Sequence, residues 1–190
     1  MLKQAFSVMA LGFCFLQVTN AQTINQTKVD ARGREMLLGK IDKIGLTEGA
    51  YALWFNNQHE SYKADTELVK SIKSELAKHK ITLFMATWCG DSKREVPRFF
   101  KILEAADYPM DQLTVVAVDH EKDQYKKSPG GEEKGLNIIK VPTFIFYKDG
   151  KAVNRIVESP VESLEKDIKV IITGGTYVPN HSNVPVLPVD

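Results

Sequence analysis

A strand-like apolar run leads directly into Ala86-Thr87-Trp88-Cys89-Gly90-Asp91-Ser92, and this junction limits the folds open to the chain. The run begins at Ile81, and helical periodicity starts at about Asp91, so Cys89 lies where a strand gives way to a helix. Helix N-termini concentrate unsatisfied N–H groups and positive potential, and a thiol at such a position is favoured as the thiolate. The sequence therefore predicts an α/β unit with a cysteine at a strand-to-helix junction.

Strands and helices alternate along this part of the chain. We expect, in order, a strand at 81–87, a helix at about 91–106, a strand at 113–119, a loop or partial helix, strands at 143–148 and 152–158 around an Asp149-Gly150 turn, and a helix at 161–172. This order, βαβ followed by ββα, predicts a mixed central sheet with helices on both faces.

Several features, in this order, resemble the thioredoxin superfamily. Pro97 lies eight residues beyond Cys89, where the family's active-site helix carries its kinking proline. Val141-Pro142-Thr143-Phe144 is similar to the family's cis-proline turn, and Phe146–Lys151 is similar to its last hairpin. The resemblance covers about residues 66–174 and implies the thioredoxin fold for them.

The sequence ahead of this region reads as a leader and an extension. Lys3, the apolar stretch Ala5–Val18 and the small-residue site Thr19-Asn20-Ala21 predict a signal peptide at 1–21. We therefore expect a periplasmic or secreted protein without stable membrane insertion after cleavage, an uncleaved anchor being the alternative. Residues 22–65 are predicted to form a partly helical N-terminal extension, and residues 175–190 an extended tail.

Within the extension, residues 22–30 are polar and are expected to be poorly ordered. A helix is predicted from Ala31 to about Gly45, because apolar residues recur there at helical spacing. A second helix is predicted at Glu67–His79. In the thioredoxin-like region, the polar loop 125–134 is interpreted as a solvated insertion that could border the site.

The charge of the chain is nearly balanced. The formal net charge is +1 and falls to zero if Lys3 leaves with a signal peptide. Such a balance provides no strong field for nucleic acid or an anionic membrane, so neither is expected as a partner.

The histidines show no metal-ligand spacing, and no metal site is predicted from them. They are His59, His79, His120 and His181. His120 directly follows Asp119 at the end of a predicted strand, and we interpret these two residues as a solvated pair.

Cysteine usage decides the available chemistry. Cys14 falls in the predicted signal peptide, which leaves Cys89 as the only cysteine of the mature chain and excludes an intramolecular disulfide. Ser92 stands where a dithiol site has its second cysteine. We expect Cys89 to act as the nucleophile and the Ser92 hydroxyl to donate a hydrogen bond to its thiolate. No cofactor is expected, but an external thiol such as glutathione must resolve any adduct.

Two further positions depart from the dithiol members of the family. The buried acid that those members keep six residues before the first cysteine aligns with Leu83. The lysine that commonly pairs with this acid aligns with Val115. Because these groups handle protons in the second half of the dithiol cycle, their loss together with the second cysteine is coherent.

The resemblance also implies a partner-binding surface around Cys89, with a cis Val141–Pro142 bond that leaves neighbouring backbone groups free to pair with an extended partner. The expected partner is an exported protein or peptide that carries a disulfide or a cysteine thiol. The residues expected to contact it are Trp88, Gly90, Asp91, Val141, Pro142 and Thr143.

Three functions remain open from the sequence. The first is thiol–disulfide exchange through Cys89, by mixed-disulfide reduction, isomerisation or partner capture. The second is a non-catalytic module that uses the same groove to bind a peptide or protein, which is favoured by Ser92, Leu83 and Val115. The third is an iron–sulfur cluster shared by two chains, as in some one-cysteine glutaredoxins, although their motif carries Gly-Phe where this chain has Gly90-Asp91.

Overall fold

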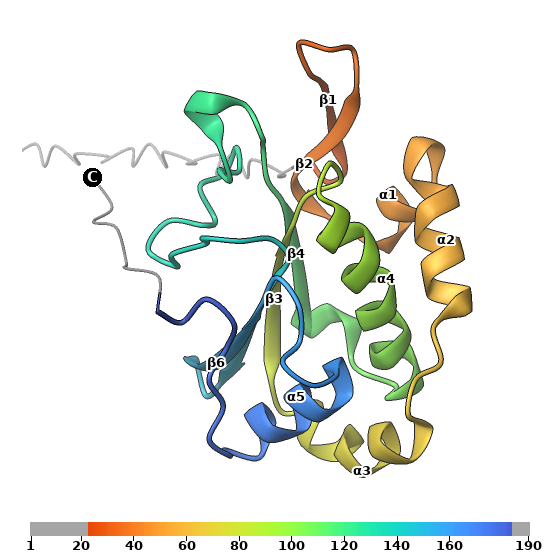
Figure 1. Cartoon of the computed structure of the whole chain (residues 1–190), viewed down its shortest axis with the longest axis vertical. Coiled ribbons are helices and arrows are strands. Elements are labelled where there is room, and N and C mark those ends of the chain that lie inside the picture. Colours follow the sequence, from red (N-terminus) through yellow and green to blue (C-terminus); the bar gives the residue numbers. More distant parts are fainter. Residues whose placement is uncertain (1–22, 184–190) are drawn as a thin grey trace, which may run out of the picture.

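A six-stranded mixed sheet forms the centre of the computed structural model, which describes residues 23–183 (Figure 1). The strand order across the sheet is β1-β2-β4-β3-β5-β6. The predicted signal peptide and residues 184–190 of the predicted tail lie outside the described residues. The elements are, in chain order, β1 (Gln26–Val29), β2 (Glu35–Ile41), α1 (Lys43–Thr47), the 3-10 helix η1 (Gly49–Tyr51), α2 (Ala52–Ser61), α3 (Thr66–Leu76), β3 (Lys80–Met85), α4 (Gly90–Ala105), the 3-10 helix η2 (Met110–Gln112), β4 (Leu113–Ala117), the 3-10 helix η3 (Lys122–Gln124), β5 (Thr143–Lys148), β6 (Lys151–Val157) and α5 (Leu164–Ile172).

The middle of the sheet follows the predicted order of elements. β3 and β4 are parallel and are joined by α4, whereas β3 pairs with β5, and β5 with β6, in antiparallel register. Asp149 and Gly150 both have positive φ, 50° and 76°, as the tight turn of the β5–β6 hairpin requires. The predicted α/β thioredoxin fold with a mixed sheet is confirmed.

All five α-helices contribute to one large apolar cluster on the first face of the sheet. Side chains alternate along β3, so that Leu83 and Met85 point into this cluster while Phe84 points to the second face. The helices each add buried residues, among them Leu46, Phe55, Ile72, Phe99 and Ile168. This face therefore holds most of the core.

The second face carries a smaller cluster, covered by the connection of residues 118–142 between β4 and β5 (Figure 1). Leu136 and Ile138 of this connection pack on that face, and η3 is its helical part. Helical structure thus occurs on both sides, but the α-helices belong to the first face. The predicted loop or partial helix is confirmed.

The N-terminal extension differs from the sequence prediction. The predicted helix at 31–45 is wrong, because β1 and β2 form an antiparallel hairpin at the sheet edge, with β2 beside β4, and only Lys43–Thr47 is helical. Leu37 and Ile41 of β2 are buried in the main cluster, and Met36 and Leu38 are buried too. A strand covered on both faces has a continuous apolar run, which periodicity does not distinguish from a helix. The expected disorder at 22–30 is wrong for β1.

The last helix and the tail are fixed by polar contacts. α5 begins at Leu164 rather than 161, because Ser163 caps it and the Asp167 carboxylate accepts the N–H groups of Val161 and Glu162 instead. The Tyr177 hydroxyl donates to the same carboxylate at 2.7 Å. The tail contains no helix or strand over residues 175–183 and is held against α5. None of the helices within residues 23–183 is both long and apolar enough to cross a bilayer.

Candidate functional site

Cys89 occupies the N-cap position of α4. Its backbone is extended, with φ −90° and ψ 128°, and its carbonyl accepts the N–H of Lys93 at 3.0 Å. The Cys89 N–H donates to Ala86 O at 3.1 Å, which fixes the turn between β3 and the helix. The side chain makes no capping bond and is partly exposed. The thiol therefore lies at the positive end of a sixteen-residue helix, as predicted.

The cysteine and the proline turn meet in space. The Cys89 thiol donates to the carbonyl oxygen of Val141 at 3.2 Å, and the Val141–Pro142 peptide bond is cis, as the resemblance implied. The turn is held by two bonds, from Glu158 N to Pro142 O at 2.7 Å and from Thr143 Oγ1 to Lys140 O at 2.7 Å.

The three predicted binding residues of this turn are shielded from solvent. Val141, Pro142 and Thr143 are all buried, and the Thr143 hydroxyl is bonded inward. Their side chains therefore offer almost no surface to a partner. Gly90, by contrast, is exposed, and a Cβ added there would meet no atom within 4 Å.

Ser92 is fully buried, unlike Cys89 one turn before it. Its Oγ accepts the N–H of Ala86 at 3.2 Å and so ties α4 to the end of β3. Across residues 23–183, no hydrogen bond joins this hydroxyl to Cys89 Sγ. The thiol and the serine thus have different partners in this form of the site.

Trp88 forms one wall of the site. Its indole N–H donates to Val118 O at 3.0 Å, and its ring lies edge-on to His120, with the ring centroids 5.7 Å apart. The Tyr125 ring lies on another side of the indole, with the two ring centroids 6.0 Å apart. The connection of residues 118–142 therefore positions this wall.

Local charges are largely compensated within the first turns of α4. Asp91 pairs with Arg94 at 2.8 Å, and Arg94 also pairs with buried Glu95 at 2.6 Å. The hydrogen bond to Glu95 is the main reason that the pKa of Arg94 is raised. The Lys93 ammonium lies 6.0 Å from the Trp54 ring, toward α2. The thiol itself lies at the N-terminus of α4, which is the positive end of the helix dipole.

The positions that handle protons in dithiol members are apolar and paired here. Leu83 on β3 lies opposite Val115 on β4 in the sheet register. Both are buried in the main cluster. No acid or base at these positions can exchange protons with the cysteine.

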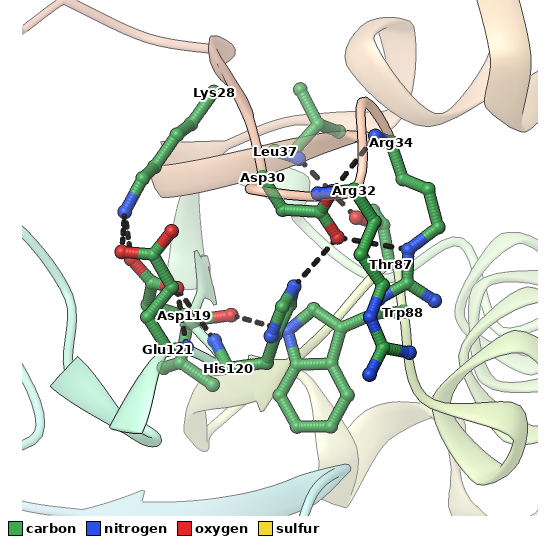
Figure 2. Close-up of polar contacts among 11 residues, drawn as sticks. Lys28, Asp30, Arg32, Arg34, Leu37, Thr87, Trp88, Asp119, His120 and Glu121 are labelled. Carbon is green, nitrogen blue, oxygen red and sulfur yellow. Dashed lines mark hydrogen bonds and ion pairs between the residues drawn. The ribbon is translucent and has the colours of Figure 1, made fainter. Parts of the chain in front are cut away.

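Asp30, His120 and Lys28 form a polar cluster beside Trp88 that the sequence analysis did not predict (Figure 2). The Asp30 carboxylate is buried and accepts bonds from Arg32 N, Arg34 N and Arg34 Nε, each at 2.8 Å. His120 Nε2 lies 3.0 Å from the same carboxylate. The Arg34 N–H bond, ahead of the others, holds the pKa of Asp30 far below its usual range.

The predicted solvated pair of Asp119 and His120 is therefore wrong. Asp119 is buried and accepts Lys28 Nζ at 2.8 Å, whereas His120 bonds to Asp30. The spacing of Asp30 to Arg34 is typical of a side-chain-capped turn, but its partner His120 is ninety residues away and carries no local signal. Over the described part of the chain, no three His, Cys, Asp or Glu side chains gather in a group that could hold a metal ion.

Comparison with known proteins finds thioredoxins that are similar to this chain in sequence. Thioredoxin-3, mitochondrial, of Saccharomyces cerevisiae is 33% identical over 86 residues, 45% of this chain and 60% of the relative. Thioredoxin of Mycolicibacterium smegmatis is 36% identical over 74 residues, 39% of this chain and 60% of the relative. The chain thus spans about three fifths of the length of these two relatives.

Among solved structures, mitochondrial thioredoxin 3 of Saccharomyces cerevisiae in its oxidised form is similar to this chain at 28% identity, with 59% of this chain and 97% of that chain covered and a TM-score of 0.35. The family model described as Thioredoxin matches residues 61–170, which include the cysteine junction, the helix with Pro97 and the cis-proline turn. With more than half of its length matched by that model, the chain belongs to the thioredoxin family.

Proposed function

We propose that this chain carries out thiol–disulfide exchange with a single thiol, Cys89, on exported proteins or peptides. Thioredoxin family membership makes redox exchange the expected chemistry. The observation that carries the one-thiol form is the position of Cys89 Sγ, partly exposed at the start of α4 and 3.2 Å from Val141 O beside the cis-proline. Ser92, buried and oxygen-bearing, supplies no second sulfur.

In the first step, the Cys89 thiolate attacks one sulfur of a mixed disulfide between a partner cysteine and glutathione. The partner–glutathione S–S bond breaks, a Cys89–glutathione disulfide forms, and the partner thiolate leaves and takes up a proton. The helix N-terminus stabilises the negative charge on Cys89 before the attack. We expect the Ser92 hydroxyl, whose oxygen already accepts Ala86 N–H, to turn its proton toward the thiolate.

The second step needs a thiol from outside. A glutathione thiolate attacks the adduct, which releases glutathione disulfide and restores the Cys89 thiolate. One free glutathione is therefore consumed for each partner mixed disulfide, since the other half of the glutathione disulfide is the glutathionyl group that the partner carried. Because Leu83 and Val115 cannot exchange protons, solvent and the incoming thiol supply the proton balance.

Partner docking would use the main chain of the proline turn. The Val141 carbonyl accepts only the Cys89 thiol among the described residues, and within them the Val141 N–H makes no hydrogen bond. An extended partner segment can pair with both groups in the manner of an added strand. A partner N–H that bonds to the carbonyl competes with the thiol for this acceptor and so favours release of the thiol.

The test is turnover of a glutathionylated peptide with glutathione supplied, measured for matched cysteine variants. Cys14→Ser should keep full activity, because Cys14 belongs to the predicted leader. Cys89→Ser should reduce turnover to the uncatalysed rate. The rate should also rise with glutathione concentration. Equal turnover by the two variants would refute the proposal.

The apolar Leu83–Val115 pair favours one rival, a non-catalytic module that binds partners in the same groove. Partner binding that is the same in the chain and in Cys89→Ala, together with absent turnover, would support that rival.

Export is tested separately by N-terminal sequencing of the secreted or periplasmic chain. A first residue of Gln22 is expected, and a chain retained with Met1 would contradict export with cleavage.

A further inference from the structure

A hollow of about 340 Å³ lies between the turn of the N-terminal hairpin and the residues that follow β4. Its polar lining comes from two segments far apart in sequence, and it includes Asp30, Arg32, Arg34, His120, Glu121 and Lys122. We call this space the Arg32 hollow. Neither the one-thiol mechanism nor the core packing accounts for it.

The two carboxylates of the Arg32 hollow are already compensated within the chain. Asp30 accepts hydrogen bonds from two backbone N–H groups and from the side chain of Arg34, and it also contacts His120. Glu121 pairs with Lys28 Nζ at 2.7 Å. Neither acid is therefore available to neutralise a further cation.

The cations of the hollow are less completely used. Among the described residues, the side chains of Arg32 and Lys122 make no hydrogen bond or ion pair, and both residues are exposed. Arg34 uses its Nε toward Asp30. In Figure 2 the Arg32 guanidinium extends away from the turn, toward the side of the cluster where Trp88 and His120 lie. The Arg32 hollow therefore has an excess of positive charge and an unpaired guanidinium.

The Arg32 hollow also adjoins the proposed site. His120 lines it, and the His120 ring packs edge-on against Trp88, the residue before Cys89. We expect about four residues of extended chain, which span about 13 Å at about 3.3 Å per residue, to cross from Cys89 past the Trp88 and His120 rings, whose centroids are 5.7 Å apart. A partner held at Val141 and Cys89 can therefore reach the hollow without a change of fold.

We propose that the Arg32 hollow binds a carboxylate side chain of the partner peptide, about four residues from its reactive cysteine. The inference rests on the proposed function, since it selects partners for the same thiol. A guanidinium presents parallel N–H donors that match the two oxygens of a carboxylate. Lys122 adds a second charge at the rim. Because the site is exposed, its contribution is modest and falls with salt.

The test compares two glutathionylated peptides that differ in one residue, with Glu or Gln about four positions from the cysteine. At low salt the chain should turn over the Glu peptide with a kcat/KM about two- to fivefold higher than the Gln peptide. Arg32→Gln should abolish this preference, and high salt should weaken it. The matched control is Lys151→Gln, which removes an exposed positive charge at the start of β6 and should leave the preference intact.

A second arm separates this inference from the proposed catalysis. The Cys89→Ala chain is titrated with the same two peptides carrying serine in place of cysteine, and the same preference should appear in Kd. Preference in binding without turnover of either peptide would overturn the proposed function and sustain the Arg32 hollow. Equal values for the two peptides in both arms would overturn the hollow. A drop for both peptides alike in Arg32→Gln would also overturn it, because the bound carboxylate would then belong to glutathione.

Discussion

The two faces of the sheet differ in how they are covered and in whether they adjoin the site. The first face is covered by all five α-helices and holds the large apolar cluster that includes Leu83 and Val115. The second has a small cluster under the irregular connection of residues 118–142, and Trp88 and Cys89 pack against that cluster. The difference implies that stability depends chiefly on the first face and the site geometry on the second, so the two properties can be changed separately.

Core substitutions should cause the greatest loss of stability, and one made on each face measures how much each face contributes. Ile81 packs in the first cluster and Ile145 in the second, and both are buried. Replacing a buried isoleucine by alanine costs about 2–5 kcal/mol, depending on how far the site can collapse. We expect Ile81→Ala to cost near the upper end and Ile145→Ala near the lower end, because the connection can relax into the space more easily than five packed helices.

Urea denaturation of both variants measures the two free energies of unfolding. The expected result is a larger loss for Ile81→Ala at an unchanged slope with denaturant. Equal losses, or a larger loss for Ile145→Ala, would break the proposed division between the faces.

The second effect concerns the hydrogen bond between Ser92 and Ala86, which joins the two faces at the site. Ser92, on a first-face helix, accepts the N–H of Ala86, which belongs to the second cluster. Ser92→Ala leaves that buried N–H without its partner and should lower the free energy of unfolding by about 1–3 kcal/mol. Ser71→Ala, an exposed serine on α3, is the matched control and should change stability by less than about 0.5 kcal/mol. Similar losses for both serines in thermal or urea unfolding would contradict this account of Ser92.

The weakest of the three effects is a loss of stability at low pH. It arises at the contact between the N-terminal hairpin and the connection that covers the second face. The hydrogen bond from Arg34 N–H, together with those from Arg34 Nε, Arg32 N and His120, lowers the pKa of Asp30. A lowered folded-state pKa means that the stabilisation is complete above the unfolded pKa of about 3.9 and is lost as pH falls through the folded value. Stability of the chain should therefore decline below about pH 4 more steeply than that of Asp30→Asn.

Unfolding curves between neutral pH and pH 2 test this difference, with Asp149→Asn as the control at an exposed turn. That control should follow the parent chain through the acid range. Parallel declines in the parent chain and in Asp30→Asn would show that the Asp30 cluster does not hold the hairpin.

The sequence predicted the elements that have strong local signals. The apolar run of β3, the periodicity of α4 and the Asp149-Gly150 turn each depend on neighbouring residues, and each lies within a few residues of its predicted position. The meeting of Cys89 with the cis-proline turn came from the family resemblance, since no local pattern relates residues 89 and 141.

The hairpin and the polar cluster were not predictable in the same way. β2 is buried on both sides, so its apolar residues carry no alternation, and the helix predicted at 31–45 had the same pattern. The contacts of Asp30 with His120 and of Lys28 with Asp119 join residues about ninety positions apart. Such contacts are set by the position of the hairpin at the sheet edge, which depends on the whole fold.

In the proposed mechanism, Cys89 alone passes through a mixed disulfide and is then restored. The most direct measurement is the intact mass of the Cys14→Ser chain after incubation with a glutathionylated peptide, and again after addition of free glutathione. We predict a glutathione adduct on Cys89 in the first spectrum, with the peptide released as a thiol, and the unmodified mass in the second. An unchanged mass in the first spectrum, with the peptide still glutathionylated and Cys89 still a thiol, would contradict the one-thiol mechanism.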